Sequence, residues 1–127
     1  MITGIEGLTT AALSAALDAA SMQQRVIAAN IANVNTPGYV PMRLQFSAHL
    51  DALAMPGRGG AGTDPATLLA VSMDLRQARD ASGVMDTVQP DQEVAAMSEN
   101  ALHYQALATA LDKHYSILTS AVSDGKR

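Results

Sequence analysis

Apolar side chains recur along the N-terminal part of the chain in alternating steps of four and three residues. This spacing is a heptad pattern over three repeats, which predicts a helix from about Thr9 to Val34 with one apolar seam. Gln24 is the polar exception, and a single polar seam residue often sets the register of a helix pair. The apolar seam positions are Leu13, Leu17, Ala20, Ile27, Ile31 and Val34.

The last third of the chain has a longer pattern of the same kind. Pro90 suits the first turn of a helix, because its missing N–H would be unpaired there anyway, and Asp91 and Glu93 favour the positive end of the helix dipole. Residues 91–122 would form a rod of roughly 48 Å at 1.5 Å per residue. The nine seam positions are Val94, Met97, Ala101, Tyr104, Ala108, Leu111, Tyr115, Leu118 and Val122.

The middle of the chain, residues 35–90, lacks such periodicity. We expect a short helix over about Leu44–Met55, a flexible loop over the Gly- and Pro-rich residues 56–65, and either a strand or a helical turn over 67–73. Residues 80–91 are expected to be an extended connector. The prediction is an elongated all-α protein in which helical units at 1–34 and 91–127 pair like a coiled coil. Together they would form one discontinuous domain.

The faces away from the seams carry few charges. From Thr9 onward the first helix has only Asp18 and Arg25, and no charged residue occurs between Val26 and Met42. A helix that is small or apolar all round is usually surrounded by protein. Packing as a hairpin within one bundle would explain the seams alone, but 127 residues have too little mass to cover both helices. We therefore expect neighbouring subunits to cover the outer positions Ala19, Met22, Val26, Ala29, Ala32, Ala95, Ala96, Leu102, Ala110 and Ile117.

Composition argues against several classes of function. The net charge of −4 and scattered basic residues disfavour nucleic-acid binding. Without cysteine there is no thiolate site, and no apolar stretch is long enough to span a membrane. The three histidines, His49, His103 and His114, are far apart in the sequence, and no pair of carboxylates lies beside His103 and His114 to complete a metal site. We expect no catalytic, metal or cofactor site, and no cleaved signal peptide.

One stretch near the end of the first helix, Ala-Asn-Ile-Ala-Asn-Val-Asn-Thr-Pro-Gly-Tyr at 29–39, needs a separate explanation. Asn35, Thr36, Pro37 and Gly38 stop a helix well, because the residue before proline avoids the α region and Pro-Gly fits a type II turn. Asn30 and Asn33 lie earlier, where asparagine is unfavourable. They either cap the helix locally or form hydrogen bonds at subunit contacts, and we favour the second interpretation.

This stretch resembles the signature of bacterial flagellar axial proteins of the rod and hook, Ala-Asn-x-x-Asn-x-x-Thr-Pro-Gly-Tyr/Phe. The C-terminal segment resembles that of the proximal rod type. The family's Gly-Asn-x-Val-Asp-Leu before the last helix survives only in traces, as Ser-Gly-Val-Met-Asp-Thr-Val-Gln-Pro-Asp. The matching C-terminal residues are Glu93, Met97, Glu99, Asn100, Leu102, Tyr104, Gln105, Ala106, Leu107, Lys113, Tyr115, Leu118, Ala121 and Val122.

The resemblance implies a structural subunit of the flagellar basal-body rod, self-assembling through its terminal helices around an axial channel and needed for motility. It implies export through the flagellar type III apparatus to the periplasmic space. Expected partners are copies of itself, other rod subunits and the adaptor that joins the rod to the membrane ring. A small helical adaptor or secretion-chaperone-like module is the alternative. The expected motif and interface residues are Asn30, Asn33, Thr36, Pro37, Gly38, Tyr39, Leu13, Leu17, Ile27, Ile31, Met97, Asn100, Tyr104, Gln105, Leu111, Tyr115 and Leu118.

Overall fold

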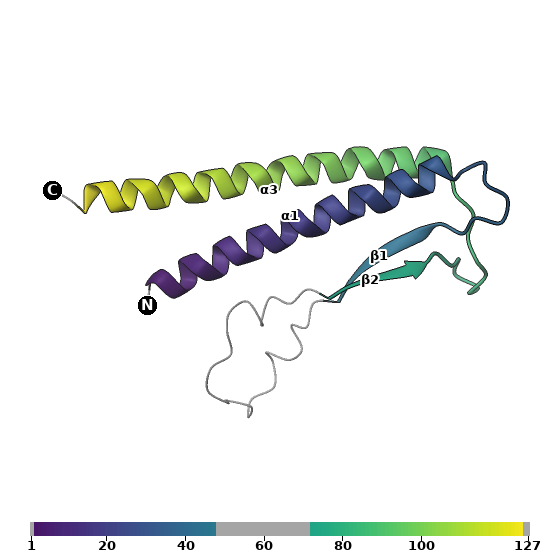
Figure 1. Ribbon diagram of the computed structural model, residues 1–127, viewed down its shortest axis with the longest axis horizontal. Coiled ribbons are helices and arrows are strands. Elements are labelled where there is room, and N and C mark those ends of the chain that lie inside the picture. Colours follow the sequence, from purple (N-terminus) through teal and green to yellow (C-terminus); the bar gives the residue numbers. More distant parts are fainter. Residues whose placement is uncertain (1, 48–71, 126–127) are drawn as a thin grey trace, which may run out of the picture.

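The computed structural model describes residues 2–47 and 72–125. Two long helices, α1 (Ile2–Ala32) and α3 (Pro90–Asp124), run antiparallel, and a hairpin of β1 (Met42–Ser47) and β2 (Ser72–Gln77) lies on the other side of α1 from α3 (Figure 1). The helices are closest where α1 ends and α3 begins, and they diverge toward the chain termini. An elongated, mainly helical fold is therefore confirmed, with a small antiparallel sheet added to it.

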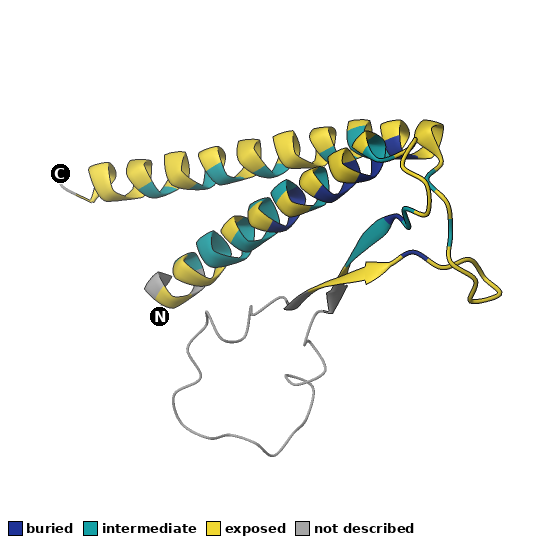
Figure 2. Cartoon of the chain, turned by 45° about the vertical axis from the view of Figure 1, so that its right-hand side comes forward, coloured by how far each residue is buried: buried dark blue, intermediate teal, exposed yellow. Residues whose placement is uncertain are grey.

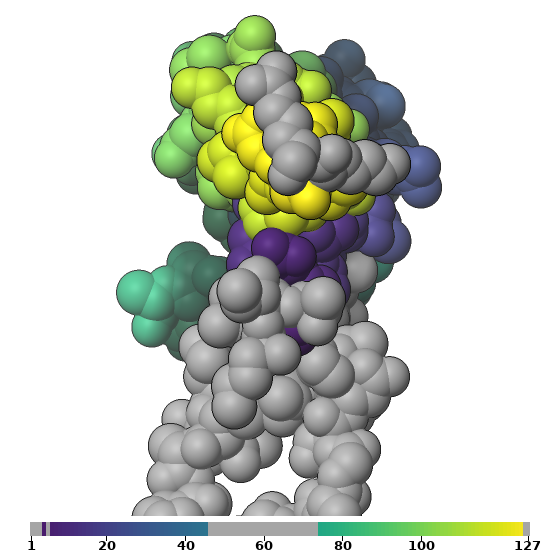
Figure 3. Space-filling model, turned by 90° about the vertical axis from the view of Figure 1, so that its left-hand side faces the viewer, coloured from purple at the N-terminus to yellow at the C-terminus, as the bar shows by residue number. Residues whose placement is uncertain are grey.

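The helix boundaries follow the local sequence. Pro90 occupies the first turn of α3, with Asp91 and Glu93 beside it, as predicted. The helix ends at Asp124, where the N–H of Gly125 caps the carbonyl of Ala121. The first helix begins at Ile2, several residues before the predicted start. Seen end-on from the side of the chain termini, the C-terminal end of α3 (yellow) is above the N-terminal part of α1 (purple) (Figure 3). Neither described helix is long and apolar enough to cross a lipid bilayer.

The hairpin replaces part of a helix that the sequence pattern led us to expect. The short helix predicted for Leu44–Met55 is wrong over residues 44–47, which belong to β1; its remainder lies outside the described residues. Apolar and polar residues alternate along β1 with the period of two that a half-buried strand requires. The register pairs residues of the same kind across the two strands. Leu44 is opposite Leu75 on one side of the ribbon, and Arg43 is opposite Arg76 on the other. Of the stretch expected to be strand or helix, residues 72 and 73 lie in β2 and 67–71 lie outside the described residues.

The connector after β2 is partly extended, as expected, but it also contains a tight turn. Arg79 and Met85 form an isolated antiparallel bridge, and the four residues from Asp80 to Gly83 reverse the chain. Gly83 has φ +83°, a conformation that glycine adopts without the Cβ clash that other residues suffer. The strand pairing also continues one step beyond β2, since Ala78 N donates to Pro41 O at 2.8 Å.

Burial is concentrated at the end where the helices and the hairpin meet (Figure 2). The buried apolar residues of the described chain are Ala19, Ala20, Val26, Ile27 and Ala78, and Pro41 is also fully covered. Ala19 and Val26 were expected on the outer face of the first helix, and this expectation is wrong. The first helix packs against α3 with one side and against β1 with another, so it has two buried faces instead of one.

The side of α3 that packs against α1 differs from the predicted seam at every second position, where the more buried residue is the one before the predicted residue. Met97, Leu111 and Leu118 are half-buried as expected, but Val94, Tyr115 and Val122 are 53, 49 and 65 % exposed. The more buried positions are instead Glu93, Asn100, Leu107 and His114, which also repeat every seven residues. A purely apolar pattern missed this seam because three of these four members, Glu93, Asn100 and His114, are polar.

Candidate functional site

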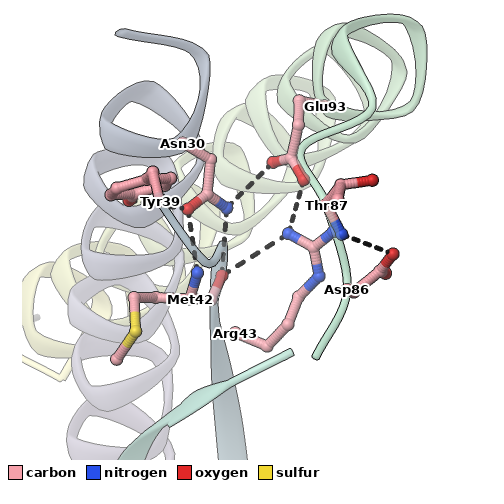
Figure 4. A network of polar contacts seen from close by, with 7 residues as sticks. All are labelled: Asn30, Tyr39, Met42, Arg43, Asp86, Thr87 and Glu93. Carbon is pink, nitrogen blue, oxygen red and sulfur yellow. Dashed lines mark hydrogen bonds and ion pairs between the residues drawn. The ribbon is translucent and has the colours of Figure 1, made fainter. Parts of the chain in front are cut away.

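The side chain of Asn30 is the centre of a polar cluster that joins α1, β1 and α3 (Figure 4). It is 0 % exposed, and each of its four hydrogen-bonding positions has a partner. Oδ1 accepts from Met42 N at 2.9 Å and from the Tyr39 hydroxyl at 3.1 Å. Nδ2 donates to Met42 O at 3.0 Å and to Glu93 Oε2 at 3.1 Å. A primary amide can form two bonds through each group, so its capacity is fully used.

The two bonds between Asn30 and Met42 reproduce what a neighbouring strand would do. In an antiparallel ladder, a residue pair exchanges both N–H···O bonds, and here the Asn30 amide exchanges both with the main chain of Met42. The open edge of β1 is thereby attached to α1 at its first residue. A carboxylate could not make both bonds because it has no donor, and an apolar side chain could make neither.

Glu93 is a buried carboxylate, 1 % exposed, at the start of α3. Its Oε2 accepts from Asn30, while Oε1 forms an ion pair with Arg43 Nη1 at 2.5 Å, outside the angular range of a hydrogen bond. The same guanidinium nitrogen contacts Met42 O at 3.4 Å. The positive end of the α3 dipole also favours an anion here. A buried charge requires such compensation, since its desolvation costs several kcal/mol, as a rough figure.

The residues after Asn30 turn the chain so that it returns to this cluster. Tyr39 N donates to Thr36 O at 3.2 Å, and Gly38 has φ +75°, as in the type II turn predicted for Pro37-Gly38. The turn brings the Tyr39 hydroxyl back to Asn30. We name the cluster of Asn30, Tyr39, Met42, Arg43 and Glu93 the polar clamp.

Asn33 has a local role in the same segment. Its Nδ2 donates to Ala29 O at 2.8 Å, and its Oδ1 accepts from the Thr36 hydroxyl at 3.2 Å. Asn33 therefore links the end of α1 to the turn. Asn30, which we had placed at a subunit contact, is instead occupied within the chain, and such a contact is no longer needed to explain its position.

A second polar contact fixes α3 along α1. Asn100 Nδ2 donates to Ala20 O and to Gln24 Oε1, each at 2.8 Å. Gln24 is the polar residue of the predicted seam, and the structure thus supplies its partner. Because Asn100 needs both acceptors at once, a shift of α3 by one turn would break the contact. This contact therefore favours the observed register between the helices.

The other expected residues do not gather into one site. They are distributed along the helix pair, with Ile27 buried, Tyr104, Gln105 and Tyr115 exposed, and the rest half-buried. Met42, Arg43 and Glu93 were missing from the expected set. The half-buried members are Leu13, Leu17, Ile31, Met97, Leu111 and Leu118.

A sequence signal for the missed residues existed only in part. Glu93 belongs to the C-terminal family pattern and precedes the apolar seam by one position. Arg43 lies just before the segment predicted as a helix, Leu44–Met55, and no strand was predicted there, so its position on a strand beside α3 could not be inferred. The polar groups of the clamp are occupied by one another, and this arrangement holds three elements together.

Comparison with known proteins agrees with this architecture. The family described as Flagella basal body rod protein matches residues 11–39, which include the end of α1 and the turn. The flagellar basal body rod protein FlgB of Bacillus subtilis is 28 % identical over 123 residues, covering 90 % of this chain and 92 % of that protein.

Two enterobacterial proteins of the same name show similar relationships. FlgB of Escherichia coli K12 is 27 % identical over 128 residues, and FlgB of Salmonella typhimurium LT2 is 28 % identical over 123 residues. In both cases the match covers 87 % of this chain and 89 % of the relative. These matches extend well beyond the signature. The chain is thus similar to flagellar basal body rod proteins of the FlgB type over most of its length, and to the rod family at residues 11–39.

Proposed function

We propose that this rod subunit assembles with copies of itself through α1 and α3, as part of the drive shaft that crosses the periplasm, and that cells need it for motility. Similarity to the rod family at residues 11–39 and to FlgB proteins over most of the chain supports the structural role. Beyond this structural role, we propose how the subunit assembles and that swimming requires it. We also propose that it has no catalytic activity, binds no cofactor or nucleic acid, and does not span a membrane.

The observation that carries the proposal is the apolar outer surface of α3. Leu102, Ile117 and Val122 are 69, 67 and 65 % exposed, and Val94 is 53 % exposed. Burying one such side chain stabilises a protein by roughly 1.5–3 kcal/mol relative to leaving it in water. These side chains lie on more than one side of α3, and apolar surface that is left exposed marks interaction sites. Neighbouring subunits would supply the cover that the single chain lacks.

The proposed partners follow from the place of a rod subunit in the basal body. They are other copies of the chain, the other rod subunits, the adaptor between rod and membrane ring, and the flagellar type III apparatus during export. Helices that pair along their length leave one side each for neighbours, so a packed tube of helix pairs fits the exposed surface. The hairpin, attached by the polar clamp, would lie at the outside of such a tube.

Deletion of the gene in its host tests this function. We expect deletion cells to lose swimming and to lack complete rods when isolated basal bodies are viewed by electron microscopy, with both restored by a plasmid copy. Complete rods in the deletion strain would contradict the proposal. A plasmid copy with Gln77→Ala, an exposed change in β2 and not on α1 or α3, serves as the matched control for expression.

A second measurement uses the purified chain. Sedimentation velocity should show association that increases with protein concentration, with a parallel rise in helix content by circular dichroism. A fully helical species of fixed size, melting cooperatively at every concentration, would instead favour the adaptor or chaperone alternative.

A further inference from the structure

A hollow of about 300 Å³ lies on one side of the seam between α1 and α3. Small side chains create it, since Ser21 and Ala101 leave room where larger residues would fill the groove between the helices. Its lining is mainly apolar, with the Gln24–Asn100 contact at its base. The lining residues are Ala20, Ser21, Gln24, Asn100, Ala101 and Tyr104.

The hollow belongs to a longer apolar stripe on α3. Positions 94, 101, 108, 115 and 122 follow each other at intervals of seven, so they share one side of the helix. All five are apolar or aromatic, and all are exposed. The stripe adjoins the seam that packs against α1. A third helix could therefore lie in the groove between α1 and α3 and contact both.

A candidate side chain for the hollow lies on α3 itself, but on the face directed away from α1. Leu102 is 69 % exposed, the largest exposed fraction among the large apolar residues of the described chain. With 100° per residue, position 102 points roughly opposite to the seam positions Glu93 and Asn100. It cannot enter the hollow of its own chain, whereas Leu102 of another copy can.

Two exposed charged residues indicate how the α3 helix of the second copy is oriented in this contact. Arg25 is exposed and lies one helical turn after Ser21, while Glu99 is exposed and lies one turn before Leu102. Neither has an ion-pair partner within residues 2–47 and 72–125. If Leu102 of a second copy occupies the hollow beside Ser21, then Glu99 of that copy comes over Arg25 when its α3 runs antiparallel to α1.

We propose that the hollow receives Leu102 of a second copy of this chain, with Glu99 of that copy paired to Arg25. In this arrangement the α3 helices of the two copies are parallel. The donor and acceptor surfaces are different parts of one chain, so the contact is heterologous and each copy can bind a further one. This inference rests on the proposed self-assembly and names the contact that would produce it.

The chain has no cysteine, which allows a direct test by disulfide formation. Full-length chains carrying Ser21→Cys or Leu102→Cys are mixed in equal amounts and oxidised mildly. We expect the mixed dimer to form at least about tenfold faster than either self-paired dimer. Thr119→Cys replaces Leu102→Cys in the control, because position 119 is exposed but lies more than four helical turns further along α3, and it should give only background.

Charge reversal gives an independent readout of direction. Arg25→Glu or Glu99→Arg alone should weaken association by roughly two- to fivefold, as expected for an exposed ion pair. The double variant should recover, because every contact then has the reversed pair. Circular dichroism of each variant confirms that the helices are retained.

Two results would overturn the proposal. One is self-paired Ser21 or Leu102 dimers at the rate of the mixed dimer, since this would indicate a two-fold symmetric contact. The other is a double charge variant that associates no better than the single variants. Failure of this contact is distinguishable from failure of the rod function, because loss of swimming on gene deletion does not depend on which surfaces meet.

Discussion

The carboxylate of Glu93 accepts a hydrogen bond of 3.1 Å from the amide of Asn30, although the two residues are 63 positions apart in the chain. Both side chains are essentially without solvent exposure. The contact joins the end of α1 to the start of α3, and through Met42 it also holds the hairpin. One polar side chain therefore connects three elements that are distant in sequence, and its removal should weaken the attachment of each element.

Replacement of Asn30 by Ala should strongly destabilise the chain. The change removes four hydrogen bonds and leaves the buried Glu93 carboxylate with one partner fewer, so we expect a loss of about 2–4 kcal/mol in the free energy of unfolding. Urea denaturation followed by circular dichroism measures it. Asn33→Ala is the matched control, because Asn33 bonds only to its own segment, and its cost should stay within about 1 kcal/mol. Equal stabilities for the two variants would contradict the clamp.

Replacement of Arg43 by Met should destabilise the chain more than the same change at Arg76. Both arginines pair with a carboxylate, but the partner of Arg43 is the buried Glu93, whereas Arg76 pairs with an exposed Asp74. We expect a loss of about 1–3 kcal/mol for Arg43→Met, reduced by the partial exposure of its guanidinium. Arg76→Met should cost less than about 1 kcal/mol.

A double-mutant cycle separates the ion pair from the packing of the Arg43 stem. Glu93→Gln removes the negative charge, so Arg43→Met should cost less in that background than in the original chain. An identical cost in both backgrounds would show that the charge interaction contributes nothing.

The sequence predicted the two helices well because each carries a long periodic signal. Pro90 and the acidic residues beside it also marked the start of α3 to within one residue. The hairpin was missed because β1 is only six residues long and its partner β2 begins at Ser72. A strand of this length is defined by pairing with a distant segment, and no local pattern reports that pairing.

For a related reason, the sequence predicted some residues of the polar clamp but not their partners. Asn30 was conspicuous as an unfavourable residue near a helix end, and the turn after it followed from Pro37-Gly38. What Asn30 contacts could not be inferred, because its partners Met42 and Glu93 come from elements placed by tertiary packing. The surplus of asparagine was a signal of polar contacts, and the structure shows contacts of Asn30 within the chain.

Asp80 should titrate below its ordinary range. The Ser82 hydroxyl donates to its carboxylate at 2.6 Å, and the Val84 and Ser82 amides add further bonds, so the pKa of Asp80 is lowered. A depressed pKa means that the turn is favoured above the unfolded-state pKa and loses this support as pH falls through the folded value. Titration of the carboxyl carbon by NMR measures this pKa.

Ser82→Ala removes the strongest of these bonds and should move the pKa of Asp80 back toward the ordinary value. Ser98→Ala, whose hydroxyl bonds only to Val94 O within α3, should leave it unchanged. No movement in the Ser82 variant would show that the hydroxyl does not hold the carboxylate.

The same substitution should have opposite effects at two glycines. Gly38 has φ +75° in the turn, so Gly38→Ala should cost about 1 kcal/mol in backbone strain. Gly4 lies within α1, and an added Cβ there would meet nothing within 4 Å. Gly4→Ala should therefore stabilise the chain by up to about 1 kcal/mol, through helix propensity. Thermal unfolding of both variants checks the prediction, which fails if the two shifts have the same sign.

The contact between Gln24 and Asn100 should matter for register more than for stability. Asn100→Leu alone should cost about 1–2 kcal/mol, because Gln24 Oε1 and Ala20 O lose their donor. Replacing both Gln24 and Asn100 by Leu gives an apolar seam that should recover or exceed the original stability, as often happens when polar seam pairs are removed. Without the polar pair, nothing at this level of the seam forbids α3 from sliding by a turn along α1.

Amide NMR spectra distinguish the two effects. We expect one set of resonances for the original chain and additional or broadened sets for the double Leu variant, at equal or greater stability in urea. A single sharp set in the double variant would show that the register is held elsewhere, and the polar clamp at Asn30 would then be the element that fixes both the position of the hairpin and the alignment of the helices.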